Sequence, residues 1–125
     1  MTKEIDFLII GAQKAGTTFL HNVLSSSDNI FMPALKELPF FLEKDLGDAN
    51  YQKFVKEFFN KSKSNQIIGT STPQYMMYPE CFHNIKKRLP SVKIIVILRE
   101  PIKRLISHYD MVYRFGQETR TINDV

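Results

Sequence analysis

An apolar strand that runs directly into a glycine-bounded loop and then into a helix constrains this chain most. Residues 7–10 are consecutive apolar residues, as in a strand buried on both faces. The sequence Gly-Ala-Gln-Lys-Ala-Gly-Thr-Thr follows at residues 11–18, and apolar residues at helical spacing continue to about residue 26. A strand, a loop and a helix in this order form the layout of a phosphate-binding loop. We therefore predict an anion site at the end of the first strand.

The position of the lysine distinguishes this loop from that of nucleotide kinases. In the pattern GxxxxGK[ST] the lysine follows the second glycine, whereas here Thr17 follows Gly16 and Lys14 lies inside the loop. Gly11 and Gly16 permit a tight turn and a close approach of backbone N–H groups to an anion. Hydroxyl groups of Thr17 and Thr18 could bind the same oxygens, and Lys14 supplies one positive charge.

Predicted strands and helices alternate along the rest of the chain. Strands are expected at residues 30–32, 66–69 and 92–98, and helices at residues 50–60, 79–89 and from Pro101 to about Phe115. Residues 36–41 should form a loop or a short extended stretch, and residues 70–73 a loop. This alternation is typical of an α/β fold in which helices flank a parallel sheet. Ligands bind outside the carboxyl ends of the strands in such folds, so the loop at residues 11–18 and Arg99 should face one crevice.

Arg99 follows the second long apolar strand and carries a forked guanidinium that suits a phosphate. Ser107 lies about two helical turns further along, where its hydroxyl could reach the same group. The alternative is that Arg-Glu-Pro only starts a helix and that Ser107 is a small helix residue.

Length and composition narrow the class of protein. The 125 residues suit one domain, residues 1–125, and 43% of them are hydrophobic, which is enough for a core. The net charge of +4 fits an anionic ligand and does not argue for nucleic acid. Cys81 is the only cysteine, the histidines lack ligand spacing, and no apolar run approaches a membrane span, so we expect no metal, no membrane span and a cytoplasmic location.

Four segments, in order, resemble motifs of sulfotransferases that use 3′-phosphoadenosine 5′-phosphosulfate (PAPS). Residues 11–18 look like the 5′-phosphosulfate loop, and residues 98–109 look like the 3′-phosphate motif. Residues 36–41, Lys-Glu-Leu-Pro-Phe-Phe, are similar to a Lys-Glu-Pro-His-Phe-Phe segment of the heparan-sulfate branch. Residues 72–75, Thr-Pro-Gln-Tyr, resemble the Thr-Pro-Ser-Tyr loop of that branch. The resemblance implies the P-loop-like sulfotransferase fold.

The resemblance also implies a role for each matching residue. Ala15, Gly16, Thr17 and Thr18 would bind the 5′-phosphosulfate, and Arg99 and Ser107 the 3′-phosphate. Lys14 would stabilise charge on the leaving phosphate oxygen, and Glu37 would act as general base toward a hydroxyl or amine acceptor. PAPS would be the donor, adenosine 3′,5′-bisphosphate (PAP) the product, and no metal would be required.

The chain departs from this family pattern in two places. Related sequences often carry Glu-Lys where Thr70 and Ser71 stand, so a second lysine of the site is either missing or replaced by Lys36 or Ser71. Family members are also longer, and we expect a C-terminally truncated version of the fold. The acceptor stays open among a saccharide, a lipid and a small metabolite, and the oligomeric state is not predicted.

Two other functions fit parts of the pattern. A P-loop kinase or NTPase is disfavoured, since no lysine follows Gly16 and no Asp closes a predicted strand. A truncated nucleotide-binding module without turnover is compatible with the short length.

Overall fold

The computed structural model describes residues 4–44 and 46–125. Its sheet is parallel, with the strand order β2-β3-β1-β4, and the strands are β1 Phe7–Gly11, β2 Ile30–Phe31, β3 Ile67–Ser71 and β4 Lys93–Val96. The helices are α1 Thr17–Ser25, α2 Asp48–Phe59, α3 Pro79–Arg88 and α4 Pro101–Arg114. The predicted α/β class with a parallel sheet is confirmed.

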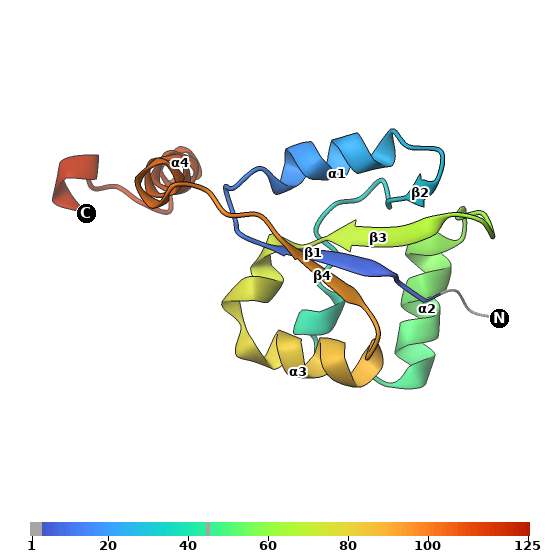
Figure 1. Cartoon of the computed structure of the whole chain (residues 1–125). Coiled ribbons are helices and arrows are strands. Elements are labelled where there is room, and N and C mark those ends of the chain that lie inside the picture. The colour runs from blue at the N-terminus through green and yellow to red at the C-terminus, as the bar shows by residue number, and fades with distance from the viewer. Residues whose placement is uncertain (1–3, 45) are drawn as a thin grey trace.

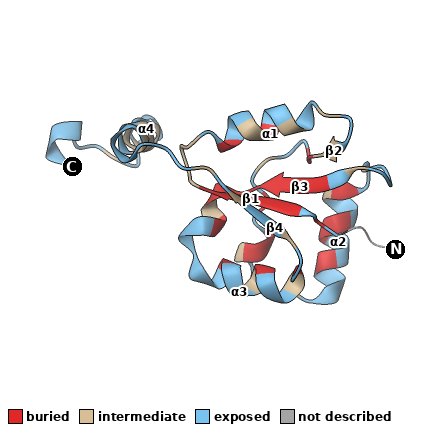
Figure 2. Cartoon of the chain, in the orientation of Figure 1, coloured by how far each residue is buried: buried red, intermediate tan, exposed pale blue. Residues whose placement is uncertain are grey.

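Helices cover both faces of the central strands (Figure 1). Successive side chains of β1 point to opposite faces. Phe7 and Ile9 pack with Met32 beneath α1, whereas Leu8 and Ile10 join the larger core that α2 and α3 complete. Figure 2 shows that the buried residues concentrate in β1, β3 and α2. This double coverage explains why residues 7–10 are all apolar.

The third strand is longer than predicted. Thr70 and Ser71, expected in a loop, continue β3 opposite Leu8 and Ile9 of β1, and both are buried. The loop prediction is therefore wrong for Thr70 and Ser71. Their backbone continues the parallel pairing with β1, and their small hydroxyl side chains fit between the two layers of helices. The other strands and helices differ from their predicted bounds by only a few residues at their ends.

The C-terminal part of the fold is much more exposed than the rest. β4 is an edge strand whose Ile94 and Val96 are more than 40% exposed, and Leu98 beyond it is 75% exposed. No side chain of α4 is buried, and α4 lies apart from the body of the sheet (Figures 1 and 2). In the described ranges, no helix is both long and apolar enough to span a membrane.

Candidate functional site

A cleft of about 330 Å³ lies where β1 and β4 end. It is lined by seven of the eight residues singled out from the sequence: Lys14, Gly16, Thr17, Thr18, Glu37, Arg99 and Ser107. Gln13, Lys36, Pro73 and Met111 complete its wall. Segments from four separate parts of the chain therefore meet at the carboxyl edge of the sheet, which is where a parallel α/β fold binds ligands.

The loop between β1 and α1 has a backbone shaped for an anion. Gly16 is left-handed, with φ of +103°, and immediately precedes the first turn of α1. No side chain caps this helix, so its first N–H groups and the positive end of its dipole face the cleft. Thr17 is buried and Thr18 is exposed, both in the first turn. Lys14 is itself left-handed, with φ of +63°, within the same turn.

Arg99 joins α4 to this loop across the cleft. Its Nη1 donates to the carbonyl oxygen of Lys14 at 3.1 Å, although the residues are far apart in sequence. Glu100 caps α4 by accepting hydrogen bonds from the N–H groups of Ile102 and Lys103, and these bonds lower the pKa of its carboxyl group. The Arg-Glu-Pro sequence thus starts the helix, as the alternative reading has it, and Arg99 also reaches the loop.

Glu37 lies on the segment between β2 and α2 and lines the same cleft as Lys14. Its backbone is left-handed, with φ of +68°, and its N–H donates to the carbonyl oxygen of Ser71 at 2.9 Å. Its Oε1 lies 2.8 Å from Nζ of Lys36. The Lys36 side chain is 18% exposed and that of Glu37 is 41% exposed, so the pair forms part of the cleft wall and reaches solvent.

Two side chains of the Thr-Pro-Gln-Tyr segment hold the backbone beside Glu37. The Thr72 hydroxyl donates to the Leu38 carbonyl at 3.0 Å, and the Tyr75 hydroxyl donates to the same oxygen. Burial raises the pKa of Tyr75 well above its usual value, so this hydroxyl remains a donor. This positioning role was not predicted, and the only signal for it in the sequence is the resemblance of the Thr-Pro-x-Tyr segment.

Ala15 is the one predicted residue that does not line the cleft. Its N–H donates to the Ala12 carbonyl at 3.2 Å and so closes the turn of the loop. Of the two candidates for a second polar group, Ser71 is fully buried in β3, whereas Lys36 lines the cleft. Met111, one helical turn after Ser107, is an addition that the helical period could have predicted.

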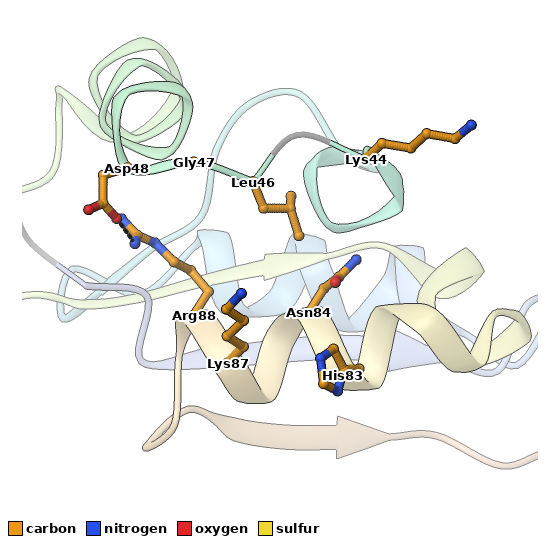
Figure 3. Close-up of a pocket in the computed structure, with 8 residues that line it drawn as sticks. All are labelled: Lys44, Leu46, Gly47, Asp48, His83, Asn84, Lys87 and Arg88. Carbon is orange, nitrogen blue, oxygen red and sulfur yellow. Dashed lines mark hydrogen bonds and ion pairs between the residues drawn. The ribbon is translucent and has the colours of Figure 1, made fainter.

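A second polar pocket, of about 500 Å³, lies between α3 and the start of α2 (Figure 3). Arg88 there forms an ion pair with Asp48, and its guanidinium carbon lies 4.1 Å from the centre of the Tyr51 ring. Asn84 donates to the carbonyl oxygen of Phe41 at 3.1 Å. These contacts join α3 to α2 and to the Glu37 segment, and none of the predicted site residues lines this pocket.

Comparison with known proteins identifies the family to which this chain is similar. Residues 4–123 match the sulfotransferase domain family. The chain is 33% identical over 116 residues to mouse (Mus musculus) heparan sulfate glucosamine 3-O-sulfotransferase 5, covering 90% of this chain and 32% of that protein. It is 29% identical over 104 residues to a membrane-associated sulfotransferase of Dictyostelium discoideum, covering 83% of this chain and 22% of that protein.

The fold is similar to a crystal structure of a sulfotransferase from Alicyclobacillus acidocaldarius. The TM-score is 0.82 at 24% identity, over 98% of this chain and 55% of that one. The chain thus spans about a quarter to a third of the curated relatives described above and about half of the solved structure. With the family match over almost all of its length, the chain belongs to the sulfotransferase domain family.

Proposed function

We propose that this chain carries the donor-binding and catalytic centre of a sulfotransferase that transfers a sulfuryl group from PAPS to an acceptor hydroxyl or amine. The observation that carries the proposal is the single cleft in which Lys14, Glu37, Arg99 and Ser107 meet. Membership of the family supports the reaction class. The presence of Lys14, Arg99 and Ser107 in one cleft supports PAPS as the donor.

Two sets of candidate anion-binding groups in the cleft suit the two phosphate-bearing ends of PAPS. The uncapped start of α1, with Thr17 and Thr18, would bind the 5′-phosphosulfate. Arg99 and Ser107 on the α4 side would bind the 3′-phosphate, because a guanidinium and a hydroxyl offer directional donors to phosphate oxygens. Arg99 also donates to the Lys14 carbonyl, so this side chain is tied to the loop that precedes α1.

The residues between these sites supply the chemistry. PAPS provides a sulfuryl group on a phosphate leaving group. The oxygen or nitrogen of the acceptor would form a bond to sulfur while the bond between sulfur and the phosphate oxygen breaks. Glu37 would accept the proton that the attacking hydroxyl or amine loses. Lys14 would stabilise the negative charge that develops on this leaving oxygen. No metal is needed for this charge stabilisation.

We assign Lys36 to the same reaction. Its ammonium group is 2.8 Å from the Glu37 carboxylate and lines the cleft. When Glu37 takes up the proton of the acceptor, its negative charge is lost and the attraction to Lys36 weakens. The ammonium is then available to the sulfuryl oxygens, a role that the buried Ser71 is not placed to fill.

A transfer assay tests this proposal. Radiolabelled sulfate should pass from PAPS to at least one member of a panel of saccharide, lipid and small hydroxyl acceptors. Lys14→Ala should lower kcat by about 10²–10³-fold and Glu37→Gln by about 10²–10⁴-fold. Lys44→Ala, in the pocket of Figure 3, is the control and should leave the rate unchanged. Transfer that survives both cleft substitutions would contradict the assigned roles.

The kinase alternative makes a different prediction. Phosphoryl transfer from ATP would depend on magnesium. Two results together would favour that alternative. The wild type would hydrolyse ATP in the presence of magnesium and lose this activity in Lys14→Ala, and it would transfer no sulfuryl group from PAPS.

A further inference from the structure

The loop between β1 and α1 is held to the β4 side of the sheet at its base and at its tip. At the base, the N–H of Ala12 donates to the carbonyl oxygen of Ile97 and the N–H of Ile97 donates to the carbonyl oxygen of Gly11, each at 2.8 Å. At the tip, Nη1 of Arg99 donates to the carbonyl oxygen of Lys14 at 3.1 Å. The loop that would bind the 5′-phosphosulfate is therefore tied to the side chain that would bind the 3′-phosphate.

The peptide group between Lys14 and Ala15 is held at its carbonyl and at its N–H. The carbonyl oxygen accepts from Arg99, and the N–H, which belongs to Ala15, donates to the carbonyl oxygen of Ala12 at 3.2 Å. These bonds fix the plane of the peptide next to Lys14, whose φ of +63° lies in the left-handed region. A residue other than glycine keeps that conformation only where its surroundings impose it. The contact with Arg99 is thus part of what holds Lys14 in place.

Arg99 can contact the loop and a phosphate at the same time. A guanidinium carries several N–H donors in one plane, and the bond to Lys14 needs only one of them. The others can donate to the 3′-phosphate, together with Ser107 in the same cleft. Arg99 is exposed, and a long exposed side chain loses rotamer entropy when it is held in one position. A bound 3′-phosphate would hold the guanidinium there, and the bond to the Lys14 carbonyl would become more persistent.

We propose that Arg99 is a positioning residue for Lys14, through which the 3′-phosphate of the donor controls the rate of sulfuryl transfer. The 3′-phosphate binds Arg99, and Arg99 in turn fixes the backbone that carries the Lys14 ammonium. The protein would then select PAPS over adenosine 5′-phosphosulfate (APS), which lacks the 3′-phosphate, in kcat as well as in KM. The effect on rate rests on the function proposed above, whereas the effect on the loop can be measured without turnover.

Kinetics with two donors and two variants test the coupling, because the phosphate and the side chain can be removed independently. In the wild type, kcat should be at least about 10-fold higher with PAPS than with APS, since misplacing a reacting group by ~1 Å costs on the order of 10²-fold. In Arg99→Ala, kcat should differ by less than about twofold between the donors. Arg114→Ala, at the end of α4, is the matched control and should keep the wild-type ratio.

A role of Arg99 in binding alone predicts a different pattern. PAPS and APS would then differ in KM and have the same kcat in the wild type. Equal wild-type kcat for the two donors, or a wild-type kcat ratio that persists in Arg99→Ala, would overturn the proposal.

Amide hydrogen exchange measures the hold on the loop without turnover. In the absence of nucleotide, the Ala15 amide should exchange faster in Arg99→Ala than in the wild type, while amides of α3 should not change. In the wild type, PAP should slow exchange at Ala15 more than adenosine 5′-monophosphate does, and this difference should vanish in Arg99→Ala.

The exchange result also separates this inference from the proposed function. Exchange at Ala15 that is the same in Arg99→Ala and in the wild type would overturn the inference, even if the wild type transfers no sulfuryl group. Absence of both PAPS transfer and PAP binding in the wild type would instead count against the proposed function, so the two failures are distinguishable.

Discussion

At the level of single residues, the cleft depends on backbone conformations that few side chains adopt. Lys14, Gly16 and Glu37 all have φ between +60° and +105°, and all three line the cleft. Two of them are not glycine, which is uncommon and costs free energy. This free-energy cost falls on residues of the candidate site. It is expected where the function of a residue, and not the stability of the fold, determines its backbone conformation.

Gly16→Ala should separate stability from ligand binding. A Cβ at φ of +103° costs about 1–2 kcal/mol of folding free energy. Gly116→Ala is the matched control, because Gly116 is also left-handed, at +68°, and no atom would clash with its Cβ. Urea unfolding should show both variants destabilised, while only Gly16→Ala should weaken PAP binding. Equal PAP affinity in the two variants would contradict a role for the Gly16 turn in the donor site.

Tyr75→Phe should weaken the backbone next to Glu37. Removing the hydroxyl leaves the Leu38 carbonyl with the Thr72 bond alone, and should cost about 1 kcal/mol of unfolding free energy. Tyr78→Phe, at an exposed position, should cost nothing measurable and is the control. Chemical denaturation measures both, and equal stability of Tyr75→Phe and wild type would show that this hydrogen bond is dispensable.

Acid should also weaken the fold through His21. Since the folded state lowers the pKa of His21, the unfolded chain binds more protons as pH falls below the ordinary value of 6.5, and the free energy of unfolding decreases. The decrease should stop below the folded-state pKa. Unfolding of wild type and His21→Gln between pH 8 and 5 measures this effect, and the variant should show the smaller decrease. Equal slopes would mean that His21 titrates normally.

At the level of secondary-structure elements, helices and strands were predicted best where a local sequence pattern was sufficient to determine them. The apolar run at residues 7–10 and Gly16 before α1 each have a local physical cause, and the corresponding strand and helix are found. Thr70 and Ser71 were misassigned because their strand state depends on pairing with β1, which a local pattern does not contain. The contact between Tyr75 and Leu38 was unpredictable for the same reason, since it joins distant parts of the chain.

The start of α4 can be tested as an element. Glu100→Gln retains a similar shape but removes the charge that accepts the N–H groups of Ile102 and Lys103. Hydrogen exchange at these two amides should become faster, and PAP affinity should decrease because Arg99 is adjacent. Glu80→Gln, in the first turn of α3, is a control that should change neither quantity. Normal protection of both amides in Glu100→Gln would contradict the capping role.

At the level of the whole molecule, the candidate site residues gather in one cleft, while the surface beyond the cleft is open. β4 and α4 expose large apolar side chains, including Leu98, Ile102 and Phe115. The solved relative contains almost as much chain again as the part that matches. The candidate donor site could be predicted from the sequence because its motifs lie within residues 11–107. The acceptor could not be predicted, because no motif in the chain describes it.

The central claim is that this cleft binds both phosphate-bearing ends of a PAPS-type nucleotide without a metal. Isothermal titration calorimetry of PAP in the presence of EDTA tests it most directly, with ATP and magnesium as the comparison ligand. PAP should bind the wild type and Arg114→Ala, at the far end of α4, equally, whereas Arg99→Ala should bind about 10- to 100-fold more weakly. Binding of ATP only with magnesium, with no binding of PAP, would contradict the account.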